Sequence, residues 1–127
     1  MIFHTDMKIL LLSALLFFTV PSSFAKRIAP AAVPLIEFDE LRIKVLHWKT
    51  ENNVQNGGYI EARDQSNKLV WFRVLYKNHG DPSLESDIQD IFIKTVELRG
   101  KKPVLVIKNE NGATYYLNPK NGNSLEQ

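Results

Sequence analysis

The side chains of this chain best suited to catalysis or cation binding lie in one acidic run. Four carboxylates, Asp81, Glu85, Asp87 and Asp90, lie within DPSLESDIQD, and no basic residue interrupts them. Such oxygens bind Ca²⁺, but a calcium loop alternates Asp or Asn around a central Gly and ends in Glu, an order that this segment lacks. We interpret the acids as a helix N-terminal cap with a solvated face, and keep weak cation binding and contact with a partner or ligand as alternatives.

No other residues form a recognisable catalytic or metal-binding set. The chain has no Cys, and beyond residue 25 its two His residues, His47 and His79, stand in different turns without an HxH or HExxH motif, so no zinc site is expected. Serines occur in turns or caps, and GxSxG and SxxK are absent. We therefore predict a non-enzymatic protein without a cofactor or metal; an enzyme would need Asp87 and Asp90 placed against a bound substrate.

Trp48 is the aromatic candidate for contact with a ligand or a protein partner. It follows a predicted strand and precedes the polar loop TENNVQNGG, residues 50–58. Trp residues in such places are frequent hot spots of interfaces. Packing in the core is nevertheless our interpretation of Trp48, as it is of Trp71, and exposure for contact is the alternative for Trp48.

Short strands separated by tight turns must position these residues. Turn residues such as Gly, Asn, Asp and Pro recur along the chain, and the runs between them are rich in Val, Ile, Tyr, Phe and Trp. This pattern is typical of an all-β, mainly antiparallel domain. The predicted strands include 41–45, 68–76, 91–98 and 104–107. One short helix is predicted in the Asp81–Asp90 connection, whose apolar residues follow helical spacing.

Two segments carry more specific predictions. Lys68–Tyr76, KLVWFRVLY, is apolar on both faces apart from Arg73, which predicts a strand in the middle of a sheet with both faces covered. Asn111-Gly112 between two strand-like runs predicts a two-residue hairpin with a type I′ turn, in which both residues have positive φ.

A partial internal repeat links residues 58–64 with residues 112–118. Each segment begins at a Gly turn, runs through a strand and ends on Asp64 or Asn118. The first copy resembles the quinoprotein-type (PQQ-like) β-propeller blade repeat through Ala62, Asp64, Lys68 and Trp71, and the second copy keeps Asn118 and Gly122 of that pattern.

The blade resemblance implies architecture and no chemistry. Asp64 and Asn118 would be structural residues that accept hydrogen bonds from the backbone amides ahead of them, and Trp71 would fill the space between packed sheets. Two blade-like β-meanders cannot close a propeller. We therefore expect them to pack as a sandwich or a curled sheet, or to be covered by a partner.

A longer pattern covers most of the chain beyond the N-terminal residues. It comprises QNGGYIEARD at 55–64, LVW at 69–71, DPSLESDIQDIFI at 81–93 and NENG at 109–112. These segments resemble an uncharacterised family of small secreted bacterial proteins. The resemblance implies a fold and export, and assigns no activity.

The first 25 residues are predicted to be a signal peptide. An apolar run at residues 9–20, ILLLSALLFFTV, follows Lys8, and small residues lead up to Ala25, as signal peptidase requires. The run is shorter than the about 20 residues that span a bilayer, so we expect cleavage after Ala25 and no stable membrane anchor. Met1 and Met7 are alternative starts of translation. Export without Cys suits a periplasmic or secreted bacterial protein.

The mature chain is predicted to hold one domain that acts by binding. Residues 26–37 would form an extended Pro/Ala-rich lead segment and residues 38–127 a single β domain. The net charge of +2 at pH 7 is too small to favour nucleic acid. We expect protein–protein contact in the bacterial envelope, with an unknown protein partner or by self-association. The alternative is a ligand-binding module with a pocket near Trp48 and the Asp81–Asp90 segment.

Overall fold

The protein folds into two antiparallel sheets. The computed structural model describes residues 28–78 and 90–126. One sheet has the strand order β1-β2-β3-β4 and consists of β1 Ile36–Phe38, β2 Leu41–Val45, β3 Tyr59–Arg63 and β4 Leu69–Val74. The other has the order β5-β6-β7 and consists of β5 Ile93–Arg99, β6 Val104–Asn109 and β7 Thr114–Leu117.

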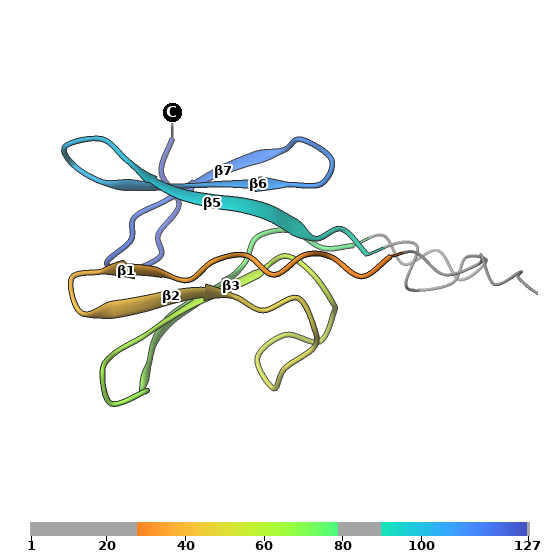
Figure 1. Ribbon diagram of the computed structural model, residues 1–127, viewed down its shortest axis with the longest axis horizontal. Helices are drawn as coiled ribbons and strands as arrows, with labels where there is room; N and C mark the ends of the chain where they lie inside the picture. Colours follow the sequence, from red (N-terminus) through yellow and green to blue (C-terminus); the bar gives the residue numbers. More distant parts are fainter. Residues whose placement is uncertain (1–27, 79–89, 127) are drawn as a thin grey trace, which may run out of the picture.

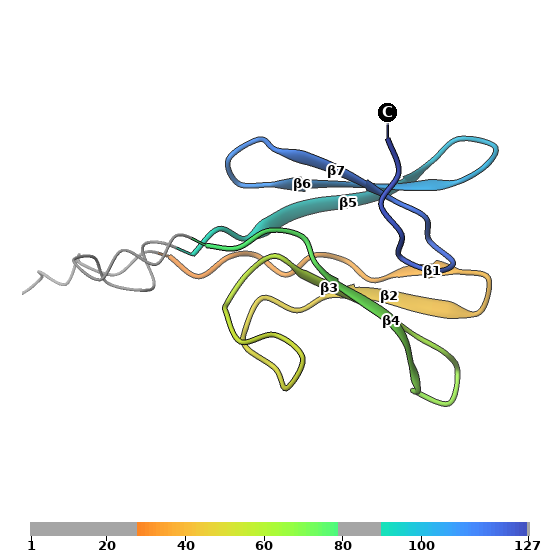
Figure 2. The same ribbon diagram turned by 180° about the vertical axis from the view of Figure 1, so that it is seen from behind.

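The two sheets face each other across one apolar core (Figures 1 and 2). Alternate residues of each strand point to this core, and its buried members are Ile43, Ile60, Ala62, Trp71, Ile93, Leu105, Ile107 and Leu117. The prediction of an all-β fold with two packed antiparallel meanders is therefore confirmed. The helix predicted within Asp81–Asp90 lies outside the described residues, except for its last position.

Trp71 lies in the core at the end of the molecule where the loop 118–123 closes over it. Only 5% of Trp71 is exposed, and its indole Nε1 donates a hydrogen bond to the Pro119 carbonyl at 3.0 Å. Gly122 packs against the ring with φ +73°, and a Cβ there would lie 2.5 Å from a ring atom. A side chain at position 122 would therefore displace the loop from Trp71.

The residues before β1 run along the core in an extended conformation. Val33 packs against the core cluster, and the Ala31 carbonyl accepts a hydrogen bond from Nε2 of the buried His47 at 2.9 Å. Within the predicted lead segment 26–37, the last two residues already belong to β1, which begins at Ile36.

The Asn111-Gly112 turn differs from the type I′ turn that the sequence predicts. Only Gly112 has positive φ, at 87°, and the turn belongs to a longer loop that Asn109 closes. Oδ1 of Asn109 accepts hydrogen bonds from the amides of Asn111 and Ala113 at 2.9 and 3.0 Å. The backbone pairs here as well, since the amide of Asn109 donates to the Ala113 carbonyl and the amide of Gly112 donates to the Asn109 carbonyl, both at 3.0 Å. The hairpin loop therefore has three residues, 110–112, and needs only one positive φ.

A two-residue turn of the type I′ form joins β1 to β2 instead. Phe38 pairs with Leu41, so only Asp39 and Glu40 remain to reverse the chain. Both have positive φ, at 52° and 65°, which matches the twist of the flanking strands. The close strand pairing thus places a Glu in a conformation that its sequence does not favour.

The β3–β4 and β6–β7 hairpins share one turn geometry. Oδ1 of Asp64 accepts hydrogen bonds from the amides of Ser66 and Lys68, both at 2.9 Å, as Asn109 does two and four residues ahead of itself. The fourth residue of each turn has positive φ, at 66° for Asn67 and 87° for Gly112. Asp64 is therefore matched in geometry by Asn109. The amide of Lys120 also donates to Oδ1 of Asn118, at 2.9 Å.

β4 lies at an edge of the four-stranded sheet, which contradicts the prediction that Lys68–Tyr76 occupies the middle of a sheet. The strand does have two apolar faces: Trp71 points to the core, whereas Val70, Phe72 and Val74 are 48%, 37% and 40% exposed. A local pattern cannot set the order of strands, because that order depends on contacts between distant segments. One apolar face of β4 is consequently left in solvent.

Candidate functional site

The free side of β4 carries an open groove. Its volume is about 640 Å³, and its lining consists of Leu69, Val70, Trp71, Phe72, Arg73, Val74 and Asn121. No described strand pairs with β4 on this side. The groove therefore combines exposed apolar side chains with a strand edge.

Backbone groups of β4 also face this groove. Leu75 N donates to Gly58 O at 2.8 Å, so the backbone of Leu75 points to β3. In an antiparallel ladder neighbouring residues alternate in this direction, which turns the N–H and C=O of Phe72 and Val74 outward. A β-bulge at Val70 interrupts the regular pairing, because Trp71 pairs with Ala62 and Leu69 pairs with the next residue, Arg63. The accessible part of the edge is thus centred on Phe72.

Arg73 closes part of this edge. Its Nη1 donates to the Phe72 carbonyl at 2.7 Å, and its Nη2 donates to Oδ1 of Asn123 at 2.9 Å and to the Asn121 carbonyl at 3.4 Å. The guanidinium therefore links β4 to the loop 118–123. It also occupies a carbonyl that an added strand would use as its acceptor.

Positive charge follows the whole length of β4. Lys68 precedes the strand and Lys77 follows it, both exposed, and Arg73 lies between them. The chain has no acidic residue from position 65 to position 78. Charged side chains at a sheet edge discourage pairing with an identical edge, and these three cations would meet their own copies in a dimer.

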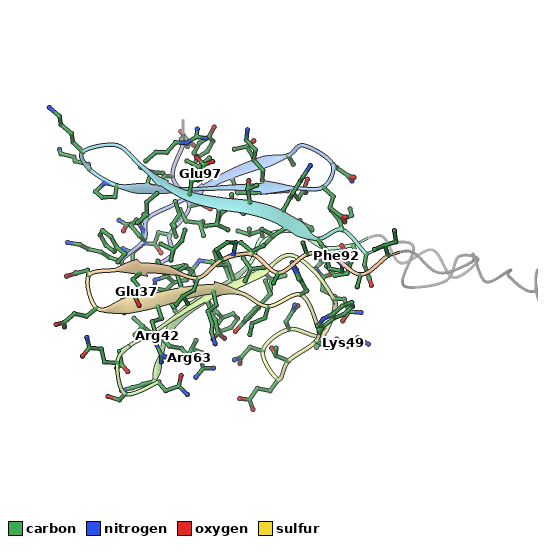
Figure 3. The ribbon with its side chains drawn as sticks, in the orientation of Figure 1. Glu37, Arg42, Lys49, Arg63, Phe92 and Glu97 are labelled. Atoms are coloured by element: carbon green, nitrogen blue, oxygen red, sulfur yellow. The ribbon has the colours of Figure 1, made fainter. Side chains whose placement is uncertain are left out.

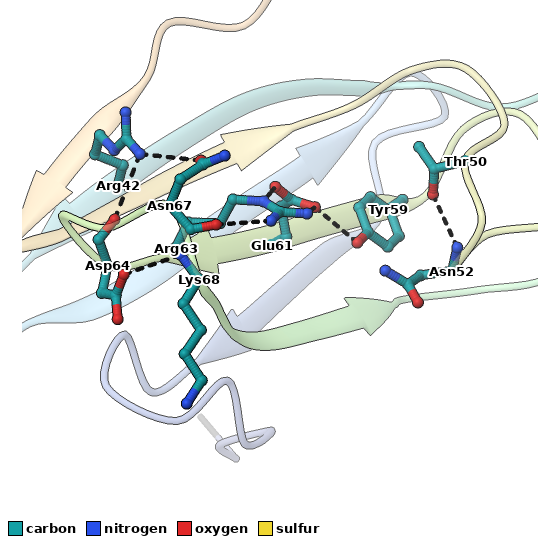
Figure 4. A network of polar contacts seen from close by, with 9 residues as sticks. All are labelled: Arg42, Thr50, Asn52, Tyr59, Glu61, Arg63, Asp64, Asn67 and Lys68. Atoms are coloured by element: carbon teal, nitrogen blue, oxygen red, sulfur yellow. Dashed lines mark hydrogen bonds and ion pairs between the residues drawn. The ribbon is translucent and has the colours of Figure 1, made fainter.

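A buried polar network occupies the outer face of β3 beside this edge (Figure 4). The Tyr59 hydroxyl donates to Oε1 of Glu61 at 2.8 Å, and Nε of Arg63 donates to Oε2 at 2.6 Å. Burial, and then the hydrogen bond to Glu61, raises the pKa of Tyr59 to about 12. Glu61 therefore has partners on both oxygens and leaves the cations of β4 without a neutralising neighbour on β3.

Phe72 rests on this network. Its ring stacks on the ring of Tyr59 with 5.8 Å between centroids, while 37% of the residue remains exposed. The buried Tyr59 therefore fixes one face of Phe72. The rest of the ring is available to a partner without rearrangement of the sheet.

Two arginines hold the β3–β4 turn against the same outer face. Arg42 and Arg63 are paired across β2 and β3, and both lie on the side away from the three-stranded sheet (Figure 3). Nη2 of Arg42 donates to Oδ1 of Asn67 at 3.1 Å, and Nη1 of Arg63 donates to the Asn67 carbonyl at 3.0 Å. The turn before β4 is thus anchored, which keeps the groove in place.

Trp48 and Asp90 are brought to the opposite end of the molecule, with different roles. Trp48 is 54% exposed, and its ring meets Phe92 edge to face at 5.4 Å between centroids. Asp90 is buried, and its two oxygens accept hydrogen bonds from the side-chain amides of Asn56 and Asn78 at 3.2 and 3.4 Å. Asp90 therefore ties the loop 46–58 to the start of β5. The predicted contact residues Asp81, Glu85 and Asp87 lie outside the described residues.

A smaller cavity opens beside Phe92. Its volume is about 320 Å³, and it is lined by Pro30, Ala31, Phe92, Ile93, Lys94 and Glu110. Trp48 does not line the cavity but contacts Phe92, which lies just before β5 (Figure 3). The carboxylate of Glu110 accepts a hydrogen bond from the Phe92 amide at 2.9 Å. The cavity is small and mostly apolar, with Lys94 as its cation.

The described residues offer no metal site and no membrane-spanning helix. Among residues 28–78 and 90–126, His, Asp and Glu side chains nowhere gather in a group of three that would hold a metal ion. No helix in this part of the chain has the length and hydropathy needed to cross a bilayer.

Sequence reasoning missed the β4 edge. The available signal was the run Lys68–Tyr76, apolar on both faces with Arg73 as the single charge after Lys68, and that signal is equally typical of a central strand. Only the sheet order distinguishes a central strand from an edge strand.

Comparison of the chain with protein-family models, with curated proteins and with solved structures found no match.

Proposed function

We propose that this protein is a small, exported, non-enzymatic β domain that acts by protein–protein contact in the bacterial envelope, and that the β4 edge is its contact surface. The observation that carries the proposal is the exposure of Val70, Phe72 and Val74 on a strand with no described neighbour on one side. Exposed apolar strand edges are sites where extended segments of other proteins add to a sheet.

The other edges of the two sheets support this assignment. β1 lies beside β5, so these two edges shield each other (Figure 1). β7 is covered by the C-terminal residues, because Leu117 bridges Ser124 and the Leu125 amide donates to the Tyr116 carbonyl at 2.8 Å. The edge of β4, by contrast, faces the open groove lined in part by Val70, Phe72 and Val74.

Site-specific photo-crosslinking in the producing cell tests the contact. A photoreactive phenylalanine analogue at Val70 is expected to yield a discrete crosslinked protein. The same analogue at Thr95, exposed on the outer face of the other sheet, is the matched control and should give none. A position 70 that crosslinks no more than position 95 contradicts the proposal.

Export is tested separately. If the signal is removed as proposed, N-terminal sequencing of the protein from the periplasm or medium should begin at Lys26. Retention of the full chain in the cytoplasm contradicts the proposed localisation but does not test the proposed contact surface.

A ligand-binding role is the second candidate, and the cavity beside Phe92 is the observation in its favour. The exposed Trp48 contacts Phe92, so a ligand in this cavity should alter tryptophan emission. A panel of sugars, peptides and cofactors would be titrated against the protein and against Trp48→Phe. A response that persists in Trp48→Phe, or none from the panel, counts against this role.

A further inference from the structure

We infer that the β4 edge binds an extended segment that alternates apolar and acidic residues, and that Arg73 exchanges its bond to the Phe72 carbonyl for an ion pair with that segment. The inference rests on the proposed function and names the chemistry of its partner. It follows from the charge along the edge, from the hydrogen bonds of Arg73 and from the alternation of side chains on an added strand.

Charge favours an acidic partner over a second copy of this chain. Lys68 lies just before β4, Arg73 within it and Lys77 after it, and no acid lies from position 65 to position 78. The Glu61 carboxylate on β3 already pairs with Arg63. Two β4 edges would bring three cations against three cations, whereas carboxylates would place opposite charges together.

The backbone chemistry requires Arg73 to move. An added strand needs the Phe72 carbonyl as an acceptor for one of its amides, and Nη1 of Arg73 now holds that carbonyl at 2.7 Å. A carboxylate on the partner offers Arg73 a stronger, charge-assisted bond in exchange. An uncharged partner would displace Arg73 without such compensation.

Side-chain alternation then defines the pattern of the partner. Residues on the outer side of the added strand meet Phe72 and its exposed neighbours Val70 and Val74, where apolar side chains bury the groove. The residues between them point to the side of Arg73. The expected segment is therefore apolar–acidic–apolar–acidic–apolar.

Short synthetic peptides test this pattern with the full mature protein. The peptide TVEVEVT is expected to bind about tenfold more tightly than TVQVQVT at low salt, with TVKVKVT weakest, and the preference should fall as salt rises. Calorimetry measures the affinities, and NMR should show the Phe72 and Val74 amides shifting. Arg73→Gln should remove most of the preference for the acidic peptide. Lys101→Gln, a matched change in the distant β5–β6 turn, should leave it unchanged.

Each result decides between the inference and its competitors. Equal binding of the acidic and basic peptides, or a preference that survives Arg73→Gln, overturns it. Self-association of the protein under the conditions of the titration also overturns the inference, because a second copy of the chain would then occupy the edge. If crosslinking at Val70 succeeds while the contacted segment is not acidic, the proposed function stands and this inference fails; if crosslinking also fails, both fail.

Discussion

The β3–β4 and β6–β7 hairpins have the same turn geometry, but the outer edge of β7 is covered and the outer edge of β4 is open. Asp64 and Asn109 close the two turns with the same pair of amide bonds. β7 is then covered by Ser124 and Leu125, whereas β4 meets the C-terminal loop mainly through Trp71 and Arg73. Turn chemistry therefore builds a hairpin without deciding which edge stays open.

The same contrast appears between the two faces of β4. Trp71 is enclosed by both sheets and by the loop 118–123, while Phe72, its neighbour in sequence, stacks on Tyr59 and remains 37% exposed. One face of the strand contributes to folding stability. The other is retained in an exposed position, which is what a binding surface requires.

The largest expected effect separates these two faces. Trp71→Ala should lower the free energy of unfolding by about 3–5 kcal/mol, because it empties a packed core site and leaves the Pro119 carbonyl without its donor. Phe72→Ala should lower it by less than about 1.5 kcal/mol, since the ring is partly exposed. Urea denaturation measures both. If the two variants lost similar amounts of unfolding free energy, both faces of β4 would contribute equally to stability, and the contrast would be wrong.

The two turns should respond alike to loss of their closing side chains. Asp64→Ala and Asn109→Ala each remove two hydrogen bonds to backbone amides, and each should lower the free energy of unfolding by about 1–3 kcal/mol. Denaturation midpoints of the two variants give the comparison. A loss at only one position would mean that the turns are alike in shape and unlike in energy.

Alkaline pH should weaken the outer face of the four-stranded sheet. The pKa of Tyr59 is about 12 in the fold and 10.0 for the unperturbed side chain. The folded state therefore holds its proton longer, and its advantage is complete below pH 10 and disappears as pH rises to about 12. The loss should be about 1–2 kcal/mol after allowance for solvent screening. Stability measured against pH checks this.

Tyr59→Phe is the control for the alkaline loss. It should flatten that part of the curve while lowering stability at neutral pH, because Glu61 loses its bond from the hydroxyl. Burial also raises the pKa of Tyr76, so some decline should remain. An unchanged curve in Tyr59→Phe would assign the alkaline loss to other groups.

The smallest expected effect compares the fourth residue of each turn. Gly112→Asn should change the free energy of unfolding by no more than about 0.5 kcal/mol, because Asn67 holds the same place at φ 66°. Gly112→Ala should lower it by about 1–2 kcal/mol through backbone strain alone, since no atom lies within 4 Å of the added Cβ. Thermal unfolding of both variants resolves the difference.

Local sequence patterns predicted a good part of this architecture. The strand predicted at 41–45 coincides with β2, and the apolar run around Trp71 correctly predicted a strand with an indole in the core. The Asn111-Gly112 signal predicted the hairpin and missed its turn type, because Asn109 closes the turn from outside that dipeptide. At Asp39-Glu40, strand pairing imposed positive φ on residues with no such signal.

The candidate site was predictable in part. Exposure of Trp48 was a stated alternative, and the structure adopts it. The interpretation of Asp90 as part of a solvated acidic face, with partner contact as an alternative, did not include its burial against Asn56 and Asn78, because these partners lie 34 and 12 positions away in sequence. The β4 edge was missed for the same reason.

Strand identity, turn positions and the burial of Trp71 follow from the order of residues, because side-chain alternation and turn bonding involve neighbours a few positions apart. The placement of β4 at an edge and the bonds of Arg73 to the loop 118–123 arise only on folding. Each depends on residues dozens of positions apart, whose meeting is selected by the packing of the whole core.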